Sequence, residues 1–177
     1  MKEILTEWRK FLMSEKLMLK PGPNGWDKYC ELVAEAYAAA KPYDDKAVNS
    51  FEALIPFVNN MFKRIEGLGI DIQFVDDHPY TGENAEEQLR QDVKKNGVLQ
   101  VSTLDAEHDI FDPATNAKFR AVHDFMSHIQ RGTQFDAQGE IASYNDHMKT
   151  VPPAAYPALF TEVVGQACSF IVNGKFP

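Results

Sequence analysis

The stretch IDIQFV at residues 70–75 decides the fold class, because it is the clearest strand signal in a chain whose other patterns are helical. Its apolar residues alternate with polar ones, and isoleucine, phenylalanine and valine favour strands. Residues 83–96 have an acidic helical pattern that ends at Asn96-Gly97, and VLQV at 98–101 is a candidate second strand. The three elements predict either a right-handed βαβ unit with parallel strands or an antiparallel pair.

Helical periodicity flanks this unit on both sides. Residues 2–19, 26–37 and 48–65 carry apolar side chains every three or four positions, which predicts three amphipathic helices. Three more helices are predicted near the C-terminus, over about 113–131, 136–149 and 154–173, because helix-breaking and helix-capping residues lie at their ends. We therefore expect an α+β fold that is predominantly α-helical, a helical bundle with a small two-stranded sheet. Residues 1–20 are predicted to form an amphipathic N-terminal helix, and residues 21–177 a single globular domain.

Composition narrows the classes of function. A length of 177 residues with 44% apolar residues is enough for one domain with a core. The net charge of -8 and the pI of about 5.1 argue against nucleic acid as a partner, since phosphate binding needs clustered basic residues. Cys30 and Cys168 lie in apolar helical patterns, as buried thiols do in a reducing compartment. Without a signal-peptide pattern or an apolar run of ~18 residues, we expect a cytoplasmic protein with no membrane partner.

The helix predicted over 113–131 contains FRAVHDFMSH at residues 119–128, which holds two histidines. At the 100° per residue of an α-helix, His123 borders the apolar side, and His128 lies about 140° away from it. The two histidines are therefore not expected to share one metal ion. Asp124 and His128, four residues apart, are expected to meet.

The next two helices each carry a polar set. Glu140 and His147 lie on one stripe together with a serine and a tyrosine, which makes half of a candidate site. Glu162 and Gln166 are one turn apart in a stripe of small residues that would let another helix approach closely. A carboxylate in such a stripe is poorly solvated, so it requires a partner, a metal or a proton.

Two interpretations of these sets remain open. If the three helices face one another, mixed imidazole and carboxylate ligands would suit a divalent metal, either Zn, Mn or Fe. Alternatively, the same groups form a buried structural network in which Glu162 bonds to Tyr144 or Gln166. Nucleotide-binding, zinc-protease, zinc-ribbon and nucleophile-elbow patterns do not occur in the sequence.

Several segments resemble a family of proteins from tailed bacteriophages and some bacteria. The segments are FRAVHDFMSH, GTQFDAQGE, YNDHM, PALFTEVVGQ and GKFP, with IQFVDDHPY, DVKKNGVLQVSTLDAEH and FDPATN upstream, so that the likeness covers roughly residues 70–177. Ser127 departs from the family pattern, which commonly has glycine there. The resemblance implies a phage-encoded protein in the host cytoplasm or the virion, and it supplies candidate positions without an activity. Those positions are Arg120, His123, Asp124, His128, Glu140, Glu162 and Gln166.

The adjacent pair His123-Asp124 also resembles the His-Asp pair of the helical metal phosphohydrolase superfamily. This resemblance favours hydrolysis, and it leads to the hypothesis of a metal-dependent hydrolase acting on a small, possibly phosphorylated, molecule. The expected metal ligands are His123, Asp124, His128, Glu140 and His147, and the expected catalytic residues are Glu162, Arg120 and Gln166. The alternative is a non-enzymatic virion or host-interaction protein with a protein partner. A helical di-iron oxidase is less favoured, because paired Glu-x-x-His motifs are missing.

Overall fold

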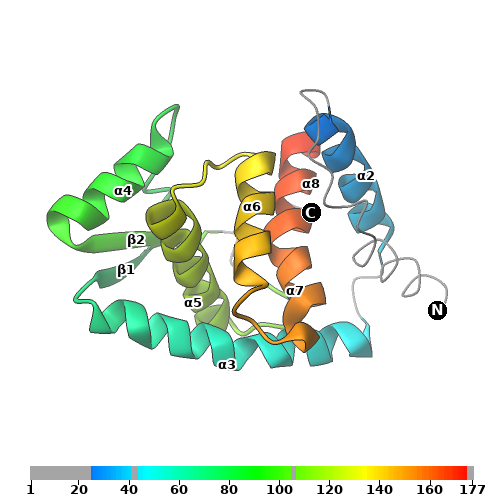
Figure 1. Ribbon diagram of the computed structural model, residues 1–177, viewed down its shortest axis with the longest axis horizontal. Coiled ribbons are helices and arrows are strands. Elements are labelled where there is room, and N and C mark those ends of the chain that lie inside the picture. Colours follow the sequence, from blue (N-terminus) through cyan, green and yellow to red (C-terminus); the bar gives the residue numbers. More distant parts are fainter. Residues whose placement is uncertain (1–24, 41–43, 105–106, 175–177) are drawn as a thin grey trace.

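The computed structural model describes residues 25–40, 44–104 and 107–174. In these ranges the fold is α+β and predominantly α-helical, with a small two-stranded sheet at one end, which confirms the predicted class (Figure 1). The amphipathic helix predicted for residues 1–20 lies outside the described residues.

The sheet consists of β1 (Asp71–Val75) and β2 (Val98–Ser102), joined through helix α4 (Ala85–Asn96). The strands are parallel, with register from Asp71 opposite Val98 to Val75 opposite Ser102, so the βαβ alternative is confirmed and the antiparallel one is wrong. Gly97 has a φ of 68°, a left-handed conformation that ends α4 and turns the chain directly into β2.

Helix α3 (Asp45–Gly67) is the longest element and lies beneath α5 and α7 (Figure 1). The side chain of Asp44 caps it by accepting from the backbone N–H of Lys46 at 2.7 Å. The helix continues through Pro56, which is exposed. Its apolar face supplies a large part of the core, with Phe51, Leu54, Val58, Phe62 and Ile65 buried.

The C-terminal helical segment packs against helix α2 (Gly25–Ala39). It was predicted as one helix over 154–173, but a π-helical turn, η4 (Thr161–Gly165), separates α7 (Tyr156–Phe160) from α8 (Gln166–Asn173), after a short 3-10 turn η3 (Pro153–Ala155). By length and composition, Pro153–Asn173 is apolar enough to cross a membrane. However, 56% of its most apolar window is buried inside the protein, as in the core helix of a globular fold.

The segment that carries the candidate histidines also departs from a single α-helix. Helix α5 (Pro113–His123) is capped by Asp112, whose carboxylate accepts from the N–H groups of Ala114 and Thr115 at 3.0 Å. From Asp124 to Arg131 the backbone is a π-helix, η2, which ends at the left-handed Gly132. Helix α6 (Ala137–His147) then returns beside η2 (Figure 1). The predicted helix over 113–131 is therefore α-helical only in its first part.

Candidate metal centre

Three side chains from consecutive segments converge on one point. His123 ends α5, His128 lies in η2, and Glu140 lies in the first turn of α6. The His123 Nε2 atom is 3.2 Å from Glu140 Oε2, His128 Nε2 is 3.4 Å from Glu140 Oε1, and the two Nε2 atoms are 3.2 Å apart. One donor atom from each residue lies within 4.8 Å of the others, so this buried group could hold a metal ion.

The π-helical backbone explains why the two histidines meet. In an α-helix, residues five apart point about 140° away from each other. A π-helix has wider turns and i→i+5 hydrogen bonds, so residues five positions apart come to the same face. The expectation that His123 and His128 cannot share a metal ion is therefore wrong, because the helix between them is not an α-helix.

The surroundings of His128 fix its orientation. Its Nδ1–H donates to the backbone carbonyl of Thr133 at 3.1 Å, which leaves the lone pair of Nε2 directed at His123 and Glu140. The ring of Phe135 packs edge-on against it, with centroids 4.3 Å apart. A backbone carbonyl that accepts from the other ring nitrogen and so sets the tautomer of a histidine is typical of metal ligands. The sequence gives no sign of this partner, because Thr133 contributes its backbone.

The three side chains lie in a poorly solvated place, with exposed fractions of 15% for His123, 1% for His128 and 12% for Glu140. Burial acts to lower the pKa of His123, but the charge and hydrogen bond of Glu140, together with the charge of Asp124, outweigh it and raise the pKa. Burial, assisted by the charge of His123, lowers the pKa of His128 to about 4. A proton on Nε2 of His123 thus lies close to Nε2 of His128 and to the carboxylate of Glu140, where a cation could replace it.

The other two predicted ligands, Asp124 and His147, border this group and lie outside the set of three. The pKa of Asp124 is raised to about 6, first because of burial, with the charge of Glu140 adding to the effect. The Nε2 atom of His147 lies 3.2 Å from the hydroxyl of Ser127, which itself lies 3.4 Å from Nδ1 of His123. Burial and the charge of His123 lower the pKa of His147 to about 3, and its Nδ1 has no hydrogen-bond partner within the described residues. Ligand roles for these two residues stay predictions.

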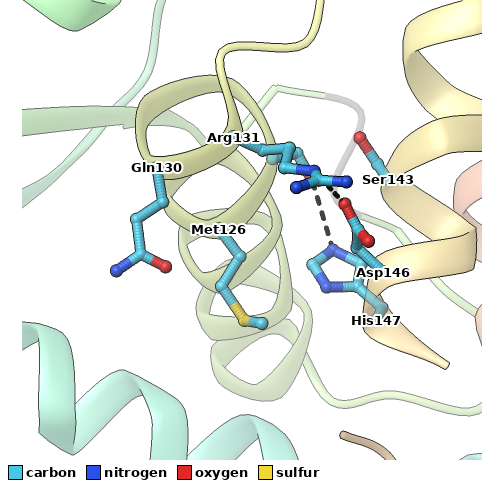
Figure 2. A pocket seen from close by; sticks show the side chains of 7 residues that line it. Met126, Gln130, Arg131, Ser143, Asp146 and His147 are labelled. Atoms are coloured by element: carbon cyan, nitrogen blue, oxygen red, sulfur yellow. Dashed lines mark hydrogen bonds and ion pairs between the residues drawn. The ribbon is translucent and has the colours of Figure 1, made fainter. Parts of the chain in front are cut away.

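A pocket of about 190 Å³ lies between η2 and α6, next to Ser127 and His147. Met126, Gln130 and Arg131 of η2 line it together with Asp146 and His147 of α6, and Figure 2 shows Arg131 reaching towards Asp146. Arg131 pairs with Asp146, which also accepts from Lys149 at 2.5 Å, so one wall of the pocket is a salt-bridge network. Ser127 and His147 line this pocket, whereas His123, His128 and Glu140 do not.

Glu162 and Gln166, predicted as catalytic residues, form a separate network. The Nδ1 atom of His108 accepts from the N–H groups of Ile110 and Phe111 at 3.0 and 2.8 Å, so its Nε2–H donates to Glu162, 3.1 Å away. Gln166 donates to the other carboxylate oxygen of Glu162 at 2.8 Å. The carboxylate has the partners that its burial requires, and one of them, Gln166, was expected. Their catalytic roles stay predictions.

Arg120, the remaining predicted catalytic residue, anchors the end of the sheet. Its Nη1 donates to the carbonyl oxygens of Ser102 and Leu104 at 3.1 and 2.7 Å. Its charge acts on Asp124, whose pKa it tends to lower against the effect of burial. Contact between Arg120 and a substrate stays a prediction.

Comparisons with protein-family models, with curated proteins and with solved structures found no match. The functional conclusion therefore rests on geometry. The described part of the chain contains a buried group of two histidines and one glutamate that could bind a metal ion.

Proposed function

We propose that the protein is a metal-dependent hydrolase that holds one divalent ion through His123, His128 and Glu140. The observation that carries this proposal is the convergence of three donor atoms within 4.8 Å, on helices that fix their positions. Zn, Mn and Fe are the metals that suit two imidazoles and one carboxylate.

The number of donors favours catalysis over a purely structural metal. Structural zinc sites are closed by four protein ligands, whereas catalytic sites such as the His₂Glu centres of zinc peptidases keep a position for water. A bound metal would lower the pKa of such a water and supply hydroxide near neutral pH. The same donor set also holds Fe(II) in oxygenases, so the metal that the protein retains separates the two chemistries.

The proposed substrate class rests on the neighbouring pocket and on a sequence resemblance. A pocket of about 190 Å³ beside the centre fits a small molecule. The His-Asp pair at 123–124, with its resemblance to metal phosphohydrolases, favours a phosphorylated substrate. A phage origin rests on the sequence resemblance over residues 70–177.

A second candidate is a non-enzymatic protein in which the same groups are a structural polar network. The observation that favours it is the pairing of Glu140 with both histidines, whose side chains are mostly buried. In this case the three side chains serve as one another's hydrogen-bond and ion-pair partners, and a metal ion contributes nothing to the stability of the fold.

The test uses full-length protein purified without added metal and then stripped with chelator. Titration with Zn²⁺, Mn²⁺ and, without oxygen, Fe²⁺ is followed by calorimetry, and hydrolysis of p-nitrophenyl phosphate and of its bis ester is assayed with each metal. We expect binding of one ion and metal-dependent hydrolysis, both lost in Glu140→Gln. The matched control is Glu83→Gln, which removes an exposed carboxylate and should retain both. Metal binding without hydrolysis of either ester would support the metal site but overturn the phosphohydrolase assignment.

A further inference from the structure

The two cysteines of the chain, which are not among the proposed metal ligands, face each other in the core. Cys30 lies in α2 and Cys168 in α8, 138 positions apart in sequence, and their Sγ atoms are 2.7 Å apart. Both residues are buried, and the structure has them as free thiols. Two sulfur atoms at this distance can be joined with only a small movement, since the bond length is about 2.05 Å.

The packing of α2 on the C-terminal segment holds the two sulfurs in register. The ring of Tyr37 lies so close to Gly165 that a Cβ on the glycine would be 2.7 Å from the tyrosine Cδ2. Tyr37 contacts Gly165, and Cys30 contacts Cys168. Because residue numbers rise along α2 as they fall along the C-terminal segment, the two run antiparallel along this seam. Because the close approach at Gly165 restricts sliding, the two thiols remain opposite each other.

We propose that Cys30 and Cys168 form a reversible intramolecular disulfide that fastens α2 to α8. The reaction is thiol–disulfide exchange with a low-molecular-weight disulfide such as oxidised glutathione. The Cys30 thiolate attacks one sulfur of the oxidant, forming a mixed disulfide and releasing one small thiolate. The Cys168 thiolate then attacks Cys30 Sγ and releases the second. Two protein thiols are oxidised, one small disulfide is reduced to two thiols, and the two protons of the protein thiols pass to the two small thiolates.

The hydrogen bond between the two sulfurs favours Cys30 as the first nucleophile. The hydrogen bond between the two sulfurs lowers the pKa of Cys30, against the effect of its burial. The same interaction and burial raise the pKa of Cys168. The thiol with the lower pKa is the attacking nucleophile, as in other dithiol pairs. Because both sulfurs are buried, exchange requires α2 to separate locally from α8, so the reaction is slow in the native protein and faster at a sub-denaturing urea concentration.

A disulfide here would close a loop that contains both strands and the whole metal centre. Constraining such a long loop in the unfolded chain stabilises the fold, and we expect the melting temperature to rise by roughly 5–15 °C. The link would join the first described helix to the last, so it would oppose the opening of the core from either end.

The experiment treats the full chain with oxidised glutathione, with and without sub-denaturing urea, and then alkylates it in denaturant for intact mass measurement. We expect a monomer that has lost two hydrogen atoms and takes up no alkyl group, with a higher melting temperature that dithiothreitol reverses. Cys30→Ser and Cys168→Ser should each keep one thiol that is alkylated or carries glutathione, and the double variant should melt at the same temperature with and without oxidant. Two alkylated thiols after oxidation in urea, or a disulfide-linked dimer, would overturn the proposal. The mass measurement on the unmodified chain does not depend on the folding of any variant.

Discussion

Replacing His147 by glutamine should make the metal-free protein more resistant to acid. The His147 side chain is 3% exposed, and burial with the nearby charge of His123 lowers its pKa from 6.5 to about 3. Below pH 6.5 the unfolded chain therefore binds a proton at this position that the folded protein does not bind, and stability falls as the pH falls. From pH 6.5 to pH 5 the difference is one and a half pH units, which at 1.36 kcal/mol per unit is about 2 kcal/mol.

Urea unfolding followed by far-ultraviolet circular dichroism, at pH 7 and pH 5 in chelator, measures this effect. Between the two pH values the wild type should lose about 2 kcal/mol more free energy of unfolding than His147→Gln, since the other titrating groups are common to both proteins. His78→Gln, which removes an exposed histidine after β1, serves as a control and should keep the wild-type loss. Equal losses in the wild type and His147→Gln would show that His147 takes up its proton in the folded state, and the reasoning would fail.

Three further substitutions test separate parts of the structure. Gly165→Ala places a methyl group 2.7 Å from the Tyr37 ring, so urea unfolding should show a loss of about 1–3 kcal/mol; an unchanged free energy would mean that the ring moves aside without cost. Glu162→Gln weakens the acceptor of the His108 Nε2–H and should lower the free energy of unfolding by about 1–3 kcal/mol with unchanged zinc affinity. Loss of zinc binding in this variant, seen by calorimetry, would place Glu162 in the metal centre. Ser127→Ala removes a hydroxyl next to the proposed metal ligand His123 and should weaken zinc binding about 10–100-fold; a change below about twofold would exclude an orienting role.

Local patterns in the sequence were sufficient to predict both strands and the helix between them. Alternation in IDIQFV and VLQV and the terminator at Asn96-Gly97 predicted β1, α4 and β2. The direction of strand pairing remained open, because short amphipathic runs fit parallel and antiparallel neighbours equally well. That choice depends on the packing of α4 and α5 against β2, which is a tertiary property.

The candidate site was predicted residue by residue, but its grouping was not. Glu140 was placed on one stripe with His147, and the structure brings its carboxylate to His123 and His128. The separation of His123 from His128 was wrong because it assumed α-helical geometry, and nothing in the residue types of DFMSHIQR marks a π-helix. The pairing of Glu162 with His108 was missed because the two are 54 positions apart and His108 precedes α5 in a loop.

Zinc titration of the chelator-treated protein tests the central claim most directly. If His123, His128 and Glu140 form a metal centre, the wild type binds one equivalent, and Glu140→Gln binds at least about tenfold more weakly, since losing a ligand should cost no less than losing a residue that orients a ligand. Bound metal should also raise the melting temperature of the wild type, because it binds the folded state preferentially. A wild type that binds no Zn²⁺, Mn²⁺ or Fe²⁺ and keeps its full stability in chelator would contradict the account and identify the group as a structural network.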